Sequence, residues 1–142
     1  MASRRIVLDT NVLVAGLRSR RGASFQLLSA IGKGQFEIAL SVPLVFEYED
    51  ALIRSLDTTG LQREDVDTVL DYLCGVAHLQ KVFYLWRPHL PDPKDDMVLE
   101  LAVAARCQTI VTFNLRDFAG TDQFGISVAR PGDFLSSIGA VR

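Results

Sequence analysis

In the segment from Arg5 to Asn11, RIVLDTN, an apolar run ends abruptly in a carboxylate, and this change is the best indication of the fold class. Residues 6–8, Ile-Val-Leu, contain no polar side chain, which is typical of a strand buried on both faces of a parallel sheet. A helical pattern begins directly afterwards at Val12. Asp9 is therefore expected at the carboxyl end of the strand, where open α/β sheets bind ligands. An equally simple interpretation is that Asp9 or Asn11 caps the helix that follows.

The composition describes one folded domain over residues 1–142. A hydrophobic content of 49% excludes a disordered chain, and no apolar run is long enough to span a membrane or to form a secretory signal. We therefore expect a soluble, cytoplasmic protein with no membrane partner.

Cys74 and Cys107 lie far apart, in no metal or redox spacing, and are expected to be buried free thiols within helical patterns. The net charge of −2 gives no basic field of the kind that nucleic-acid-binding domains carry.

The order of apolar patterns along the chain predicts the architecture. Helical periodicity predicts helices at residues 12–17, 25–31, 42–56, 62–76, 98–105 and 131–138, and short apolar runs predict strands at residues 6–8, 36–40, 82–86, 109–112 and 127–129. This alternation predicts a three-layer, doubly wound α/β sheet of four to five mainly parallel strands, with helices on both faces.

Carboxylates gather at the ends of several predicted elements. Asp92, Asp95 and Asp96 crowd the start of one helix, where the helix dipole explains one acid but not three. Asp117 follows the strand at residues 109–112. Such positions meet on one side of a doubly wound sheet, beside Asp9. Clustered carboxylates repel one another unless a cation holds them, and an all-oxygen set favours Mg²⁺ or Mn²⁺ over Zn²⁺. Such ions activate water for phosphodiester cleavage.

Further candidates are less specific. The helix at residues 42–56 carries Glu47 and Glu49 on the two rims of its apolar face, and periodicity alone does not choose between them. Arg18, together with Arg20 and Arg21 of the SRRGAS segment that follows it, forms either a phosphate-contacting loop or, as we favour, a solvated turn. His89 has no second ligand in spacing range and is interpreted as a surface residue.

Four ordered motifs, VLDTN, SVPLVFEYEDAL, DPKDDMVLELAVAA and TIVTFNLRDF, together resemble a PIN domain over nearly the whole chain. The similarity is greatest to the small prokaryotic PIN proteins that are toxins of toxin–antitoxin pairs. The resemblance implies that Asp9, Glu47 and Asp95 are metal ligands, with Asp96 as a neighbour that could substitute for Asp95. It also implies cleavage of single-stranded RNA with Mg²⁺ or Mn²⁺, an antitoxin protein as partner, and a homodimer.

The chain departs from the family pattern at one position. Many PIN domains carry an aspartate where this chain has Asn114, and other members of the toxin group have an aspartate three residues further on, which matches Asp117 here. Thr112 and Asn11 are expected to orient the acids through hydrogen bonds. The departure favours, as an alternative, a catalytically weak or inactive PIN module that binds RNA or a protein partner. A phosphatase with Asp9 as its nucleophile is disfavoured, because its expected second aspartate is here Asn11.

Overall fold

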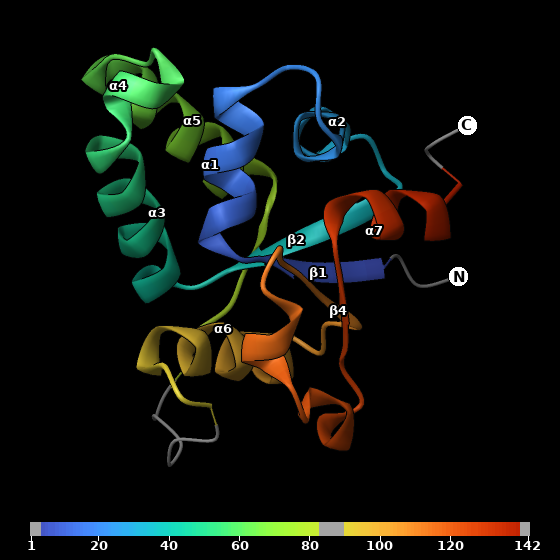
Figure 1. Ribbon diagram of the computed structural model, residues 1–142. Helices are drawn as coiled ribbons and strands as arrows, with labels where there is room; N and C mark the ends of the chain where they lie inside the picture. Colours follow the sequence, from blue (N-terminus) through green and yellow to red (C-terminus); the bar gives the residue numbers. More distant parts are fainter. Residues whose placement is uncertain (1–3, 83–89, 140–142) are drawn as a thin grey trace.

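The computed structural model describes residues 4–82 and 90–139 and contains a five-stranded, wholly parallel sheet (Figure 1). The strand order is β3-β2-β1-β4-β5, which confirms the predicted doubly wound α/β class. The elements are β1 (Arg4–Leu8), α1 (Thr10–Arg18), α2 (Ala23–Ala30), β2 (Phe36–Leu40), α3 (Val42–Arg54), α4 (Leu56–Thr59), α5 (Arg63–Val76), β3 (His78–Leu79), α6 (Pro93–Ala104), β4 (Thr109–Val111), the 3₁₀ turns η1 (Leu115–Phe118) and η2 (Thr121–Phe124), β5 (Ser127–Ala129) and α7 (Pro131–Ser137).

The strand β1 is central because its last three side chains, at residues 6–8, are apolar and buried on both faces of the sheet. Ile6 and Val7 are fully buried, and each has an apolar partner in a neighbouring strand. Ile6 is in register with Ile38 of β2, and Val7 with Ile110 of β4. A strand of this kind is stable only between two layers of helices. The uninterrupted apolar run at residues 6–8 therefore places the carboxyl end of β1 in the middle of the sheet.

The two layers follow from the handedness of the connections. The chain moves from β1 through β2 to β3 in one direction and then returns through α6 to β4 on the other side of β1. Right-handed crossovers then put the helices before β3 on one face and α6 on the opposite face. In Figure 1, α1, α2 and α7 lie above the sheet and α6 lies below it. The point where the apolar run gives way to the carboxylate of Asp9 thus falls between the two layers of helices.

Gly16 allows α1 and α2 to pack closely. A Cβ atom at this position would lie 2.4 Å from Cδ1 of Leu28 and 3.0 Å from the carbonyl oxygen of Ser24, so any side chain there would displace Leu28 or push α2 away. Gly16 is buried in the interior of α1, where glycine costs helix stability. The close contact explains why glycine is present. It also keeps α1 in the position that carries Asn11 and Arg18 beside the end of β1.

Several predicted boundaries were wrong. The helix expected at residues 42–56 ends at Arg54, and a separate short helix, α4, follows it. The third strand is at His78–Leu79, ahead of the predicted 82–86, of which residues 83–86 lie outside the described residues, as does His89. Cys107 is buried as expected, but it lies in the loop after α6. Cys74 is in α5 and is only partly buried.

No helix in the described segments, residues 4–82 and 90–139, is both long enough and apolar enough to cross a membrane.

Candidate functional site

An acidic cavity of about 400 Å³ lies at the carboxyl end of β1. Its walls come from four separate parts of the chain: the start of α1, the middle of α3, the start of α6 and the segment after β4. Five carboxylates line it, from Asp9, Glu47, Asp92, Asp95 and Asp117. We refer to it as the carboxylate cavity. It is the place where ligands are expected in an open α/β sheet, because the strand order reverses here.

Asp9 is held at the base of the cavity by hydrogen bonds to both of its carboxylate oxygens. The backbone N–H of Thr10 donates to Oδ1 at 2.9 Å, and the hydroxyl of Thr112 donates to Oδ2 at 2.8 Å. Asp9 is also the N-cap residue of α1. The capping and site interpretations are therefore compatible, since one carboxylate caps the helix and faces the cavity.

The register between β1 and β4 places Thr112 beside Asp9. Leu8 is the partner of Val111, and the N–H of Asp9 donates to the carbonyl of Val111 at 2.9 Å. The hydroxyl of Thr112 also accepts a hydrogen bond from the N–H of Asn114 at 3.0 Å. Because the hydroxyl accepts this bond, its own proton is directed to Asp9. The expected orienting role of Thr112 agrees with this geometry.

The structure separates Glu47 from Glu49. Glu47 lines the carboxylate cavity, and Glu49 is not among the lining residues. Ser41 begins α3 by accepting a hydrogen bond from the N–H of Leu44, and the hydroxyl of Tyr48 donates to the carbonyl of Leu8. This second bond ties α3 to the end of β1. Periodicity alone left both glutamates open because they flank the same apolar face; the docking angle of α3 distinguishes them.

The three acids at the start of α6 have three different surroundings. Asp92 is the N-cap and accepts a hydrogen bond from the N–H of Lys94 at 2.9 Å, while its side chain also borders the cavity. Asp95 lines the cavity. Asp96 accepts a hydrogen bond from the N–H of Leu90 at 3.0 Å and is not among the lining residues. Asp96 therefore has a structural partner of its own, and its ability to substitute for Asp95 stays a prediction.

The segment after β4 contributes Asp117 and Asn114, and both line the cavity. Asp117 lies in the first turn of η1, and its N–H donates to the carbonyl of Asn114 at 3.0 Å. The amide oxygen of Asn11, expected to orient an acid, instead accepts a long hydrogen bond of 3.4 Å from the N–H of Phe113. Asn11 thus fastens the segment after β4 to α1, and its side chain also borders the cavity.

Of the three clustered arginines at residues 18–21, only Arg18 lines the cavity. Arg18, the last residue of α1, is a lining residue, whereas Arg20 and Arg21 are exposed in the following loop. Two basic residues not foreseen as site residues, Arg54 and Lys94, also border it. The sequence carried no signal for either, because isolated basic residues on helices are common on protein surfaces.

Crowding of the carboxylates changes their acidity. Burial raises the pKa of Asp95 to about 7, and the negative charges of Asp9, Asp92, Asp117 and Asp96 add to the effect. The pKa of Asp9 is also raised, mainly by burial, although the hydrogen bonds from Thr112 and Thr10 oppose the change. Charges on Asp117 and Glu47 contribute further. A divalent cation would relieve this repulsion, so the donor set fits a hard metal ion.

As they stand, no three Asp, Glu, His or Cys side chains among residues 4–82 and 90–139 form a group that could hold a metal ion. Glu47 instead forms an ion pair with Lys94, with Oε1 3.6 Å from Nζ. The acids therefore share one cavity without converging on one point. The donor chemistry fits a metal ion, and side-chain rotation would have to bring the oxygens together around it.

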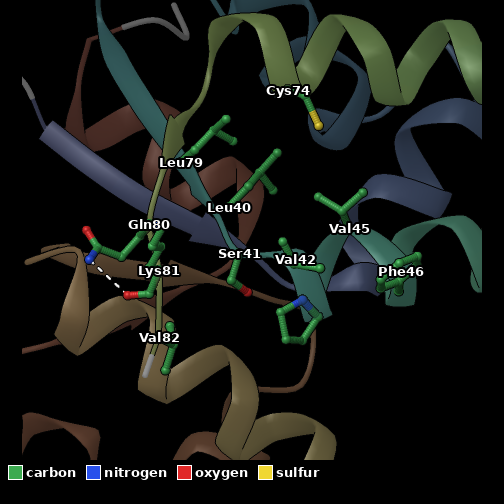
Figure 2. A pocket seen from close by; sticks show the side chains of 11 residues that line it. Leu40, Ser41, Val42, Val45, Phe46, Cys74, Leu79, Gln80, Lys81 and Val82 are labelled. Atoms are coloured by element: carbon green, nitrogen blue, oxygen red, sulfur yellow. Dashed lines mark hydrogen bonds between the residues drawn. The ribbon is translucent and has the colours of Figure 1, made fainter. Parts of the chain in front are cut away.

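A second cavity, of about 590 Å³, has a different character (Figure 2). It lies between the start of α3 and β3, and its walls are mostly apolar, with Leu40, Val45, Leu79 and Val82 among the lining residues. Figure 2 shows Cys74 of α5 at one side of it. No carboxylate lines this cavity. It therefore lacks the carboxylates that hold a hard divalent ion, and the carboxylate cavity remains the candidate site.

The comparisons with known proteins agree with this architecture. The family model described as PIN domain matches residues 5–116, and the chain belongs to the PIN-domain family. Among solved structures, the chain is similar to a chain in the structure of VapBC2 from Rickettsia felis bound to a DNA fragment from the VapBC2 promoter. The sequence identity is 16% and the TM-score is 0.59. The match covers 88% of this chain and 98% of that one, and at this identity it shows a shared fold. A search of curated protein sequences found no match.

Proposed function

We propose that this protein is an endoribonuclease that cleaves single-stranded RNA with Mg²⁺ or Mn²⁺. The observation that carries the proposal is the carboxylate cavity, where acids from β1, α3, α6 and the segment after β4 meet at the switch point of a PIN-family sheet. Carboxylates that raise one another's pKa are stable together when a cation neutralises them. The family membership supports phosphodiester hydrolysis over other uses of such a site.

In this proposal Asp9, Asp95 and Glu47 hold the metal ion, and Asp117 acts at the edge of the site. The ion, when bound, would supply an activated water and neutralise charge on the scissile phosphate. Thr112 orients Asp9 through its 2.8 Å hydrogen bond, which favours the ionised form against the effect of burial. Arg18 lines the same cavity and offers a charged fork for a backbone phosphate, while Arg20 and Arg21 are placed further out along the strand of RNA.

We further propose that the protein is the toxin of a toxin–antitoxin pair, with an antitoxin as its protein partner and a homodimer as its assembly. The fold shared with the VapBC2 chain, which was solved with promoter DNA, supports a partner of this kind.

The proposed activity is tested by incubating the purified chain with end-labelled single-stranded RNA in Mn²⁺, in Mg²⁺ and in excess EDTA. We expect cleavage with either metal and none in EDTA. Double-stranded RNA and single-stranded DNA of matched sequence serve as substrate controls. If RNA binds but is not cleaved with any metal, the chain is instead a binding module, as the amide at Asn114 would suggest.

Asp117 is expected to tune metal affinity without being indispensable. Asp117→Asn should raise the Mn²⁺ concentration for half-maximal cleavage by roughly tenfold, the effect typical of an outer-shell ligand, and retain activity at saturating Mn²⁺. Asn114→Asp should lower that concentration, because it restores a charge in the cavity wall.

The matched control is Asp122→Asn, since Asp122 has the equivalent place in the first turn of η2 and is exposed. If Asp117→Asn leaves the Mn²⁺ titration unchanged and lowers the melting temperature, Asp117 is a cap of η1 and does not belong to the site.

A further inference from the structure

Lys94 is a cation within a cavity otherwise dominated by acids. It occupies the second position of α6, between Pro93 and Asp95, and its Nζ lies 3.6 Å from Oε1 of Glu47. The Glu47 side chain is 19% exposed and the Lys94 side chain 61% exposed. The pair therefore joins a largely enclosed carboxylate to an ammonium group that reaches it from the open side.

Helix energetics do not account for a lysine at this position. The first turn of a helix carries partial positive charge from its free N–H groups, so it favours acids and disfavours cations. The contact itself also adds little to folding, because an exposed lysine in a long ion pair is well solvated. The negative charge of the carboxylate cavity, by contrast, gives the ammonium group a favourable partner in Glu47.

The other basic side chains at the cavity have different surroundings from Lys94. Arg54 is paired with Asp50 through contacts of 2.9 and 3.0 Å, on the exposed side of α3. Arg18 lines the cavity from the last turn of α1, where a cation complements the helix dipole. Lys94 is the lining residue that forms an ion pair with a candidate metal-binding carboxylate. A metal ion and the Lys94 ammonium group would therefore compete for Glu47.

We propose that Lys94 is an exchangeable counter-ion of the carboxylate cavity, one that balances Glu47 before metal binding and moves to an RNA phosphate when a divalent ion takes Glu47. This inference rests on the proposed function. A lysine suits the exchange because its ammonium group is a compact charge on a flexible stem, with rotatable donors that accept carboxylate or phosphate in turn. The exchange couples metal loading to the arrival of substrate.

The first half of the exchange is measured by calorimetric titration of Mn²⁺ into the metal-free protein, without RNA. Lys94→Met should bind Mn²⁺ roughly threefold to tenfold more tightly than wild type, as expected for one charge acting across a partly solvated gap of several ångströms. Lys94→Arg should stay near wild type because it keeps the charge. Lys33→Met is the matched control, since Lys33 is an exposed lysine in the turn before β2. Equal affinity in Lys94→Met and wild type overturns the competition.

The second half is measured by binding of a cleavage-resistant, phosphorothioate-linked oligouridylate in saturating Mn²⁺ at several salt concentrations. Lys94→Met should weaken binding and reduce the slope of log affinity against log salt by about one, the effect of losing one phosphate contact. Lys33→Met should change neither quantity. An unaltered slope in Lys94→Met overturns the transfer to phosphate.

The outcomes separate this inference from the proposed function. If wild type and Asp9→Asn bind Mn²⁺ equally weakly, the metal site itself is wrong and the exchange fails with it. If wild type binds Mn²⁺, Asp9→Asn does not, and Lys94→Met matches wild type, then the metal site stands and only the role of Lys94 is overturned.

Discussion

Replacing Asp9 with asparagine is expected to abolish both Mn²⁺ binding and RNA cleavage. Changes to groups that merely support a metal ligand cost about 10–100-fold in metal affinity or activity, so loss of a central ligand should cost more than about 100-fold. Asparagine has nearly the same shape but carries no charge. One of its amide positions must be an NH₂, which would face either the N–H of Thr10 or the hydroxyl of Thr112. Because the shape is kept and the charge is lost, the substitution removes the metal ligand with little disturbance of the backbone.

The stability of the metal-free protein decides between a metal ligand and a simple helix cap. Burial and neighbouring charges disfavour ionised Asp9, whereas its two hydrogen bonds favour it, so we expect Asp9→Asn to change the free energy of unfolding by no more than about 1 kcal/mol. Denaturant unfolding in EDTA measures this. Asp67→Asn, in an exposed position of α5, is the matched control for loss of one negative charge. A loss of about 2 kcal/mol or more, with metal binding retained, would show that Asp9 acts only as a helix cap and not as a metal ligand.

The second large effect is expected at Asp95, in the pH dependence of stability. Burial and the nearby acids raise its pKa in the folded protein to about 7 from the ordinary value of 3.8. The folded state therefore holds a proton that the unfolded state has already released, and stability without metal should fall as pH rises between these two values. Asp95→Asn removes this loss. It should unfold at higher denaturant concentration than wild type above pH 7, and at nearly the same concentration below the ordinary carboxyl pKa.

Metal binding should show the opposite dependence on pH. A divalent ion must displace the proton from Asp95, so the Mn²⁺ affinity of wild type should rise with pH until Asp95 is fully ionised, above a pH of about 7. Asp95→Asn should bind little Mn²⁺ at any pH and should not cleave RNA. Calorimetric titration across the pH range measures both expectations.

The neighbouring Asp96 supplies the control for Asp95. Asp96→Asn alters the acceptor of the hydrogen bond from Leu90, so it should lower stability modestly and leave Mn²⁺ binding close to that of wild type. If Asp95→Asn is the less stable variant at every pH and Asp96→Asn loses metal binding, the two acids have exchanged roles and the assignment is wrong.

Local patterns were sufficient for most of the fold. The run at residues 6–8 has no polar side chain, and its burial in β1 follows from that fact alone. Ser41 and Pro43 mark the start of α3, and the helix begins at Val42 as those signals predict. The prediction failed where patterns are weak: the two-residue strand β3 has no periodicity to detect, and no apolar pattern separates α3 from α4.

Local order and spacing in the chain were enough to predict that Asp9 follows a buried strand, that acids crowd the start of α6, and that Asn114 replaces an acid in the family pattern. Which of these side chains share a cavity follows from the tertiary structure. Glu47 and Asp95, the acids that the family resemblance implied, line the carboxylate cavity, whereas Glu49 and Asp96 do not. The fold also places Arg18 in the cavity wall and brings Lys94 to Glu47. The physical reason is that helix docking angles and strand register depend on packing between distant segments, which periodicity along one segment does not encode.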